Sequence, residues 1–409
     1  MNGERSETGR PRAIVLAPTF STEMNANRAM SAAYVLARFA DVEVVTCDFD
    51  HWTKQRRENK QVRPISRITY LRTMRYRSNV GISRLLSHLL FSLSASWYFV
   101  RRRRRFDIVY VTLPFNTLAW GVFRSARNQL KIADVTDIWP DVLPFRREHR
   151  VALWPLFALW RRFFTGAVKR ADVMMAVSDT FYEETLKYAR PGCRSRRFYL
   201  GEVGLLRDMP KAETLTIAYS GNIGRLYDFE TLLEVLTDLG AGSIELLIVG
   251  DGDRRDWLLT ELKQRGIPHQ YFGSVYDPAK LGAILCRAHL GFNGFVNTSA
   301  AFSTKASTYF AAGLPILNSM GGDLQWLVEK RRLGFNYEGG NPQSLRSHLS
   351  ELDMATVKEM SENCVRFFYA ELERERVRGE MLQFLRECFE TRGEAVRVSD
   401  GREWQLPDS

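Results

Sequence analysis

The sequence has few residues of the kinds that form disulfides or hold metals. Its five cysteines are scattered, odd in number and without a Cys-x-x-Cys pair; they are Cys47, Cys193, Cys286, Cys364 and Cys388. This spacing argues against a disulfide framework and a zinc cluster, and it is typical of reduced thiols in a cytosolic protein. The six histidines are also isolated, with no His-x-x-x-His pair. We therefore predict an activity that needs no metal and no cofactor.

Long apolar runs are lacking as well. Residues 1–12 are polar and charged, without the apolar core of a signal peptide. A membrane-spanning helix needs about 18 or more apolar residues, whereas the best candidate, residues 85–100, is interrupted by His88 and four serines. We therefore expect a cytoplasmic protein that is neither secreted nor integral to a membrane.

Acidic residues are scarce in the first half of the chain. Residues 1–200 hold 35 Lys and Arg but 17 Asp and Glu, a net charge of +18, whereas residues 201–409 carry a net charge of −7. A basic surface attracts polyanions, either anionic lipid or nucleic acid. The sequence contains no zinc finger, cold-shock-like barrel or recognition-helix motif. We therefore expect an anionic membrane surface as a partner and no nucleic acid.

Short apolar strands alternate with helical segments along both halves of the 409 residues, a length that suits two domains. Strands are predicted at residues 13–17, 42–46, 107–112, 131–135 and 173–177, and then at 215–219, 244–249, 269–272, 290–292 and 315–317. Helices are predicted at residues 28–39, 228–239, 254–265, 278–288, 304–312 and 355–391. This alternation predicts an α/β protein with two Rossmann-like doubly wound parallel sheets facing across a cleft, whose ligands bind at the carboxyl ends of the strands.

Domain boundaries follow from the same pattern. We predict an N-terminal Rossmann-like domain over residues 1–205 and a C-terminal Rossmann-like domain over residues 206–375. A terminal helix over residues 376–391 is expected to return to the N-terminal domain, and residues 392–409 are expected to form a mobile tail.

Glycine turns follow two strands of the second half. Gly221 and Gly224, with Arg225, lie where a strand passes into a helix, and glycines there allow backbone N–H groups to approach a phosphate. The turn from Gly250 to Gly252 is of the same kind. An ordinary glycine-containing turn explains both segments as well.

Lys305 follows the hydroxyl-bearing residues Ser303 and Thr304 in the first turn of a predicted helix, before the exit at Gly313 and Pro315. Cations are unfavourable near helix N-termini, and a bound diphosphate would explain this one. The alternative is a solvated surface lysine.

The order of these motifs resembles the family 4 type of glycosyltransferases with the fold called GT-B, in their bacterial polysaccharide-assembly branch. The resemblance covers residues 13 to about 390. The matching stretches are Ala171-Asp-Val-Met-Met-Ala-Val-Ser178, Tyr219-Ser-Gly-Asn-Ile-Gly224, Ile248-Val-Gly-Asp-Gly252 and Tyr309-Phe-Ala-Ala-Gly-Leu-Pro315. Asp137-Ile-Trp-Pro-Asp141 is similar to an Asp-x-Trp-Pro motif that lines the cleft in some of these enzymes.

The resemblance implies that residues 1–205 bind the acceptor and that residues 206–375 bind the nucleotide sugar. It also implies roles for particular residues. The donor diphosphate would be held by Gly221, Asn222, Gly224, Arg225 and Lys305. The nucleotide base would lie near Gly250, Asp251 and Gly252, and the ribose and sugar would be lined by Ser307, Thr308 and Tyr309. The acceptor side would include Asp137, Trp139, Thr19, Asn25 and Asn27.

The sequence also departs from the family pattern. Many relatives carry two glutamates eight positions apart, where this chain has Ala300 and Thr308, and Asn222 replaces the usual arginine, with Arg225 as a possible substitute. The donor, its sugar and the choice between a retaining and an inverting mechanism therefore stay open.

Transfer requires neutralising the departing nucleoside diphosphate, which positive side chains and helix dipoles can do. Asp137 is the candidate general base, and a structural aspartate that caps its own loop is the alternative.

Two segments combine aromatic side chains with arginines. Residues 83–105 carry Trp97, Tyr98 and Phe99 and then Arg101, Arg102, Arg103, Arg104 and Arg105, and residues 151–170 carry Trp154 and Trp160 beside Arg161 and Arg162. Amphipathic helices with aromatics and a basic rim bind membrane interfaces. The alternative is that both helices cover the first sheet, and both interpretations can hold at once.

We therefore predict a glycosyltransferase that moves a sugar from a nucleotide-diphosphate donor to a lipid-linked or growing glycan acceptor in surface polysaccharide biosynthesis, at the inner face of a bacterial membrane. A catalytically silent relative that binds nucleotide sugar or a partner enzyme is the alternative that Ala300 and Thr308 suggest. A sugar-nucleotide epimerase of the same fold is a third hypothesis, disfavoured because the histidines are few.

Overall fold

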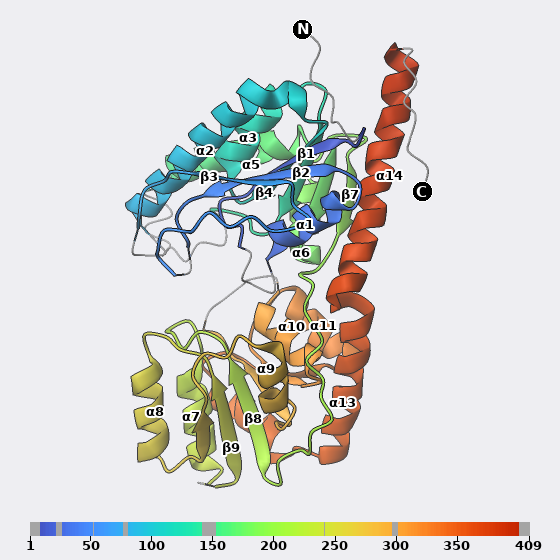
Figure 1. Ribbon diagram of the computed structural model, residues 1–409. Coiled ribbons are helices and arrows are strands. Elements are labelled where there is room, and N and C mark those ends of the chain that lie inside the picture. Colours follow the sequence, from blue (N-terminus) through green and yellow to red (C-terminus); the bar gives the residue numbers. More distant parts are fainter. Residues whose placement is uncertain are drawn as a thin grey trace. The chain divides into compact units, whose positions relative to one another are not determined.

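The computed structural model describes residues 9–21, 27–51, 53–76, 81–140, 153–240, 242–296 and 302–400, with the side chains of 393–400 left out. The chain forms two compact units (Figure 1). Unit 1 comprises Met1–Tyr199 and Arg378–Ser409, and unit 2 comprises Leu200–Val377. The boundaries therefore follow Tyr199 and Val377, whereas the sequence predicts them after residues 205 and 375.

Unit 1 is built on a seven-stranded sheet in the order β3-β2-β1-β4-β5-β6-β7. All neighbouring strands run parallel. The strands are β1 (Arg12–Leu16), β2 (Asp41–Cys47), β3 (Arg67–Leu71), β4 (Ile108–Leu113), β5 (Leu130–Val135), β6 (Val173–Ala176) and β7 (Arg194–Arg197). The central strands are apolar and buried on both faces, as parallel sheets require. The predicted doubly wound parallel sheet is confirmed.

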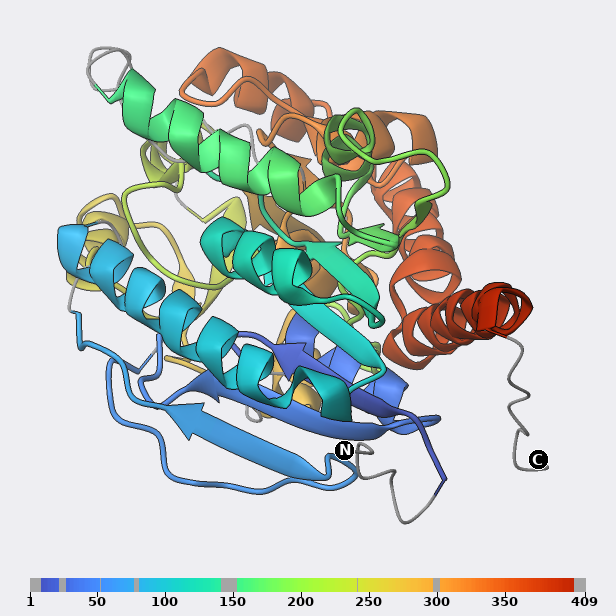
Figure 2. The same ribbon diagram turned by 90° about the horizontal axis from the view of Figure 1, so that it is seen from above.

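Helices cover both faces of this sheet. The helices α2 (Ile82–Arg102), α3 (Asn116–Ser125) and α5 (Trp154–Val168) lie side by side on one face, and α1 (Arg28–Ala37) and α6 (Asp179–Leu186) lie on the other (Figures 1 and 2). A short 3₁₀ turn, η1 (Arg103–Arg105), extends the end of α2.

Unit 2 contains a six-stranded sheet in the order β10-β9-β8-β11-β12-β13, again with all pairs parallel. Its strands are β8 (Leu215–Ser220), β9 (Ile244–Val249), β10 (His269–Tyr271), β11 (Leu290–Asn293), β12 (Ile316–Asn318) and β13 (Gly334–Asn336). Its helices are α7 (Phe229–Asp238), α8 (Arg255–Gln264), α9 (Pro278–Leu285), α10 (Thr304–Ala311), α11 (Asp323–Arg331), α12 (Pro342–Ser350) and α13 (Met354–Phe367).

The helical region predicted over residues 355–391 is interrupted. Helix α13 passes into a π-helical turn, η2 (Phe368–Leu372), and the backbone becomes extended at Glu373. The Glu373 carboxylate then accepts hydrogen bonds from the backbone N–H groups of Glu375 and Arg376, at 3.1 and 2.7 Å. This cap starts a new helix, α14 (Arg374–Asp400), which extends nine residues past the predicted end.

Helix α14 packs against unit 1 from residue 378 onward (Figure 1). Arg196 of β7 pairs with Glu380 at 2.8 Å, and Arg194 pairs with Glu387 at 3.3 Å. Phe384 packs its ring against Phe198, with centroids 5.6 Å apart. The polar edge strand β7 is therefore covered by a helix that pairs two of its arginines with glutamates.

Candidate functional site

The glycine turns of unit 2 contact each other through their backbones. The Gly221 N–H donates to Val249 O at 2.9 Å, and the Ile223 N–H donates to Asp251 O at 2.9 Å. A Cβ atom on Gly250 would lie 1.8 Å from Gly221 O, and one on Gly252 would lie 2.2 Å from Ile223 O. The close approach of the two turns thus accounts for the glycines at 250 and 252 without a ligand.

Gly221 has a second neighbour. A Cβ atom there would lie 2.9 Å from the Cδ atom of Lys305, and its φ of +149° is one that other residues rarely adopt. The stem of Lys305 therefore lies across the glycine turn. Asn222 and Arg225 are exposed on the same turn, and Asp251 is exposed beside Arg255, with 3.3 Å between carboxylate and guanidinium.

The Lys305 ammonium lies in a cage of aromatic rings. Its Nζ atom is 3.4 Å from the ring centroid of Tyr227, 4.5 Å from that of Phe295 and 5.6 Å from that of Tyr219. Within the described part of the chain, no carboxylate contributes to the pKa of this ammonium. Burial lowers the pKa of Lys305 to about 7. The rings thus surround an ammonium that pairs with no carboxylate of the described residues.

Helix α10, which carries Lys305, begins beside a row of three hydrogen-bonded asparagines. Asn293, Asn318 and Asn336 occupy neighbouring positions in β11, β12 and β13, and their side-chain amides are joined by hydrogen bonds of 2.8 Å each. The Ser303 hydroxyl donates to Asn293 Oδ1 at 2.9 Å and so does not cap α10. The N-terminus of α10 therefore has no side-chain cap, which favours an anion.

Three residues predicted to line the ribose and sugar have different environments. Tyr309 is fully buried; its hydroxyl donates to Phe292 O at 3.0 Å and accepts from Ser220 N at 2.9 Å. Tyr309 therefore joins the ends of β8 and β11, and neither its ring nor its hydroxyl is exposed. Ser307 is buried, and its hydroxyl has no partner among the described residues.

Thr308 is half-buried, and its hydroxyl can donate its one proton either to Thr304 O at 3.1 Å or to Glu202 Oε2 at 3.4 Å. Glu202 was not singled out from the sequence. Burial raises its pKa, and Arg374 lies 3.5 Å from its other oxygen. A carboxylate from a distant segment therefore lies beside the position where many family 4 relatives carry the second glutamate.

The predicted acceptor side lies in unit 1. Asp137 accepts hydrogen bonds from its own loop, at 3.0 Å from Ile138 N and at 2.7 Å from the indole Nε1 of Trp139. Burial raises the pKa of Asp137 to about 6. The Trp139 indole stacks on His88, with 5.8 Å between centroids and 15° between planes, and the Arg84 guanidinium lies 4.9 Å from its centroid.

Thr19 lies in a pocket beside this loop. The pocket is at the carboxyl ends of β1, β2 and β3 and against α2, and it is lined by Pro18, Thr19, Cys47, His51, Thr73, Tyr76, Ser87, His88 and Phe91. Asn27 shapes the nearby loop, because its amide donates to Thr19 O at 2.8 Å and its Oδ1 caps α1. Asn25 and Ala300 lie outside the described residues.

The residues that the structure adds here are His51, Tyr76, Arg84 and His88. They are isolated in the sequence and form no motif. His51 follows β2, Tyr76 follows β3, and Arg84 and His88 lie on α2, so the fold brings all four together.

Comparison with solved structures bears on both units. Sucrose-phosphate synthase from Thermosynechococcus elongatus superposes with a TM-score of 0.68 at 15% identity, covering 93% of this chain and all of that one. Anabaena HepE in complex with UDP-glucose gives a TM-score of 0.63 at 12% identity, covering 92% and 99%. WaaG, a glycosyltransferase involved in lipopolysaccharide biosynthesis, gives 0.61 at 13% identity, covering 91% and 98%.

The chain has the GT-B fold. The predicted fold is thereby confirmed, while membership of family 4 stays a prediction. No sequence-family model matches the chain, and no curated protein sequence is significantly similar to it. The Lys305 cage lies in unit 2, and the Asp137 loop and the pocket beside it lie in unit 1.

Helices α2 and α5 of this GT-B protein present apolar side chains on their surfaces. Ile82, Leu93 and Trp97 of α2 are 77%, 71% and 57% exposed, and Trp154 of α5 is 67% exposed. The same helices bury Phe91, Ala95, Phe99 and Phe164. The buried faces therefore fit the interpretation that these helices cover the sheet, and membrane binding by the exposed faces stays a prediction.

Arginines lie at the end of the exposed α2 face. The Arg101 guanidinium is 3.7 Å from the ring centroid of Trp97, and that of Arg102 is 4.0 Å from Tyr98. Arg103, Arg104 and Arg105 follow in η1, and Arg161 and Arg162 are exposed on α5. No helix in the described ranges is long and apolar enough to cross a membrane.

The described residues also contain no group of three or more His, Cys, Asp or Glu side chains suited to a metal ion.

Proposed function

We propose that this protein is a glycosyltransferase that moves a sugar from a nucleotide-diphosphate donor to a lipid-linked or growing glycan acceptor. The observation that carries the proposal is the Lys305 ammonium, held by three aromatic rings beside the uncapped N-terminus of α10 and without a carboxylate partner among the described residues. A diphosphate is the ligand that this pair of features favours. The shared fold with HepE, whose structure holds UDP-glucose, supports the same class of donor.

In the proposed reaction the bond between the sugar and the diphosphate breaks, and negative charge develops on the departing phosphate. Lys305 and the α10 N-terminus would stabilise that charge through groups that are already in place. We propose that transfer proceeds on these groups without a metal. The glycine turn at 221–224 would lie against the same diphosphate.

The acceptor hydroxyl must lose a proton as it attacks. Asp137 is the proposed base, because a carboxyl with a pKa of about 6 is ionised at neutral pH and still basic enough to take a proton. The aromatic wall of Trp139 and His88 would pack against the acceptor.

The membrane proposal completes this assignment. The exposed apolar face of α2, with arginines from Arg101 to Arg105 at its end, suits an anionic lipid surface. A lipid-linked acceptor would be met at that surface, which is why we propose a cytoplasmic protein bound to the inner membrane face and acting in surface polysaccharide biosynthesis.

Donor binding is the first test. We expect the unfolding temperature to rise with one class among UDP-, GDP- and dTDP-linked sugars, because a ligand that binds only the native state stabilises it. Lys305→Met should abolish this shift, whereas Lys263→Met, which removes an exposed lysine of α8, should retain it. If folded protein responds to none of these sugars, the donor site is wrongly assigned.

The role of Asp137 needs a test that separates a base from a loop cap. Asp137→Asn is expected to lower kcat by about 100-fold or more, since general-base catalysis contributes about 10²–10⁴-fold. Trp139→Phe removes the same indole hydrogen bond but keeps the carboxylate. Equal losses in both variants would show that Asp137 serves to orient Trp139.

A catalytically silent nucleotide-sugar-binding protein remains the second candidate, favoured by Thr308 in place of a glutamate. Such a protein would show the Lys305-dependent thermal shift. It would release no nucleoside diphosphate over hours with a crude lipid-linked acceptor fraction, whereas a transferase would.

A further inference from the structure

The row of three asparagines beside α10 is held in one orientation by the backbone. Asn293 and Asn318 are fully buried, so their amide groups need hydrogen-bond partners within the protein. The Asn318 amide donates to Met320 O at 2.9 Å, and its Oδ1 accepts from Met320 N at 3.2 Å. A backbone acceptor and a backbone donor thus determine which side of the Asn318 amide carries the oxygen.

The orientation of Asn318 in turn determines that of Asn293 and of Ser303. The Asn293 amide donates to Asn318 Oδ1 at 2.8 Å, so the Asn293 Oδ1 atom lies on the opposite side and acts as an acceptor. The Ser303 hydroxyl donates to this oxygen at 2.9 Å. Because Ser303 is buried as well, its hydroxyl is fixed against β11.

Ser303 is the N-cap residue of α10, and its backbone suits a side-chain cap. Serine is a preferred N-cap residue, and capping residues have extended backbones; the φ and ψ of Ser303 are −96° and 128°. Ser178 occupies the same position before α6, also with an extended backbone, and accepts from Phe181 N at 3.1 Å. Ser303 makes no bond of this kind. The residue type and backbone therefore do not explain the missing cap, whereas the bond to Asn293 does.

The missing cap lies next to the caged ammonium of Lys305. Lys305 is the second residue of α10, and the N-terminus of a helix carries partial positive charge from its first N–H groups. The ammonium opposes that charge, and Ser303 does not supply the oxygen that would accept from those N–H groups. Each feature is unfavourable in the protein alone, and each becomes favourable when an anion binds.

We propose that Asn293 is a positioning residue for the donor diphosphate. By binding the Ser303 hydroxyl, Asn293 keeps the first-turn N–H groups of α10 available to phosphate oxygens beside Lys305. Asn293 contacts neither the donor nor a reacting atom in this role; it prevents Ser303 from competing with the donor. The identity of the ligand rests on the proposed function, but the restraint of Ser303 by Asn293 is defined without it.

The first test is a cycle of variants, with binding of inorganic pyrophosphate and of UDP-, GDP- and dTDP-linked sugars to the full-length protein measured by calorimetry. Asn293→Ala releases the Ser303 hydroxyl to cap α10, so we expect the Kd to rise about fivefold, the factor by which a side-chain N-cap stabilises a helix. Ser303→Ala should leave the Kd unchanged, because this hydroxyl does not contact the donor. The double variant should bind like Ser303→Ala, since no hydroxyl remains to compete.

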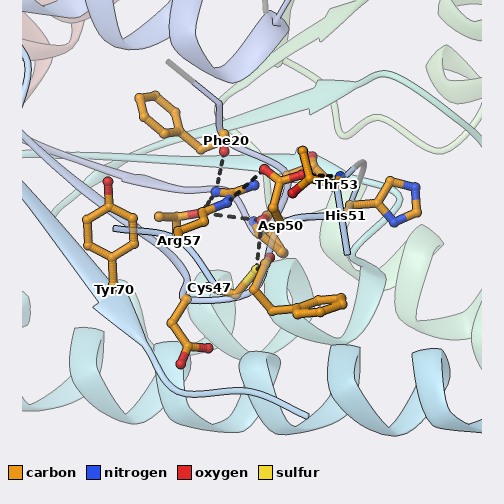
Figure 3. A network of polar contacts seen from close by, with 12 residues as sticks. Phe20, Cys47, Asp50, His51, Thr53, Arg57 and Tyr70 are labelled. Atoms are coloured by element: carbon orange, nitrogen blue, oxygen red, sulfur yellow. Dashed lines mark hydrogen bonds and ion pairs between the residues drawn. The ribbon is translucent and has the colours of Figure 1, made fainter. Parts of the chain in front are cut away.

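The structural cost of losing a buried polar side chain needs its own control. Asp50 belongs to a polar network in unit 1, where it accepts from Arg57 Nε at 3.1 Å and from Thr53 N at 2.9 Å (Figure 3). Asp50→Ala should lower the unfolding temperature and leave the Kd of the nucleotide sugar unchanged. If it raised the Kd as much as Asn293→Ala does, lost stability and not Ser303 would be the cause of weaker binding, and the inference would be overturned.

A second readout is the amide hydrogen exchange of Thr304 and Lys305, followed by NMR. In the unmodified protein, pyrophosphate should slow the exchange of these first-turn N–H groups. Asn293→Ala should slow it without any ligand, because Ser303 then caps the turn, and adding Ser303→Ala should reverse the effect. If Asn293→Ala does not fold, Ser303→Ala decides the question: a raised Kd in this variant shows that the hydroxyl contacts the donor and overturns the inference, and an unchanged Kd with pyrophosphate protection supports it.

Failure of this inference is distinguishable from failure of the proposed function. A nucleotide sugar that binds through Lys305, with a Kd that Asn293→Ala leaves unchanged, refutes the role of Asn293 alone. Slower exchange in Asn293→Ala without binding of any nucleotide sugar refutes the donor assignment alone, because Asn293 then restrains Ser303 as inferred.

Discussion

Among single residues, Lys305 is subject to two opposed effects on the charge of its ammonium. The aromatic rings stabilise the ammonium, by about 0.5–2 kcal/mol for such contacts. Burial removes water from the same ammonium, and it is the effect that prevails, because the pKa of Lys305 falls to about 7. Lys305 is therefore close to half protonated at neutral pH.

Donor binding should consequently depend on pH. An anionic diphosphate favours the ammonium, so binding above pH 7 must first add a proton to Lys305, whereas below pH 7 the proton is already present. We expect the Kd of a nucleotide sugar to be constant at lower pH and to rise about tenfold per unit as the pH increases above about 7. Calorimetry in buffers of different ionisation enthalpy would also measure the proton uptake.

Lys305→Arg serves as the control, because a guanidinium stays charged throughout this range. Tyr219 and Tyr227 stay neutral there, since burial raises the pKa of both phenols. A Kd that is independent of pH in the unmodified protein would contradict the assignment.

The sequence predicts some of these residues and not others, for a physical reason. Lys305 stands out locally, because a cation in the first turn of a helix is unusual. His51, Arg84 and Glu202 have no local peculiarity; parallel strands or a distant segment bring them to their sites. Tyr309 was assigned to the ligand from a motif, whereas the tertiary fold buries it between β8 and β11.

At the scale of elements, helix α2 has two apolar faces, one buried under the sheet and one exposed. We expect Trp97→Gln to weaken binding to phosphatidylglycerol-containing vesicles by about tenfold, because burying a large apolar side chain contributes about 1.5–3 kcal/mol. Cosedimentation with vesicles measures this.

Trp326→Gln is the matched control for vesicle binding. Trp326 is on α11 in unit 2, and its exposed fraction of 56% nearly equals the 57% of Trp97. Equal binding by both variants and the unmodified protein would argue against α2 as the membrane face.

The predictability of elements follows from their burial. The central strands are continuous apolar runs, and all were predicted within one or two residues. The sequence pattern does not predict strands β3, β7 and β13, which lie at sheet edges. Strand β7 reads Arg-Ser-Arg-Arg, and β13 has only three residues. Their strand conformation depends on their neighbours rather than on their own composition.

At the scale of the whole molecule, a buried ion pair joins distant parts of unit 1. Arg28 of α1 donates to Asp134 of β5 at 2.7 and 3.2 Å, and also to the carbonyls of Phe198 and Tyr199 at 3.2 and 3.3 Å. Tyr110 of β4 donates its hydroxyl to the same carboxylate. The chain is thus fixed at the point where it leaves unit 1.

Asp134→Ala should lower the free energy of unfolding by about 3–5 kcal/mol, because it leaves the Arg28 guanidinium buried without its counter-ion. Urea denaturation followed by tryptophan fluorescence measures the loss. The double variant Arg28→Met with Asp134→Leu removes both charges and should recover much of the stability. A single variant as stable as the unmodified protein would show that the pair contributes little.

The connection around Glu202 has a consequence for how the chain is assembled. Unit 2 is one continuous segment inserted into unit 1, and Glu202 near its start exchanges hydrogen bonds of 2.8 and 3.0 Å with Leu372 and Arg374 near its end. Because its two ends lie side by side, the segment 200–377 forms a cassette. If it is removed, the two chain ends left in unit 1 are close together. The Lys305 cage lies entirely within this cassette, so we expect that the proposed donor-binding unit can be expressed, exchanged with that of another GT-B protein, or replaced by a short linker as one piece of DNA.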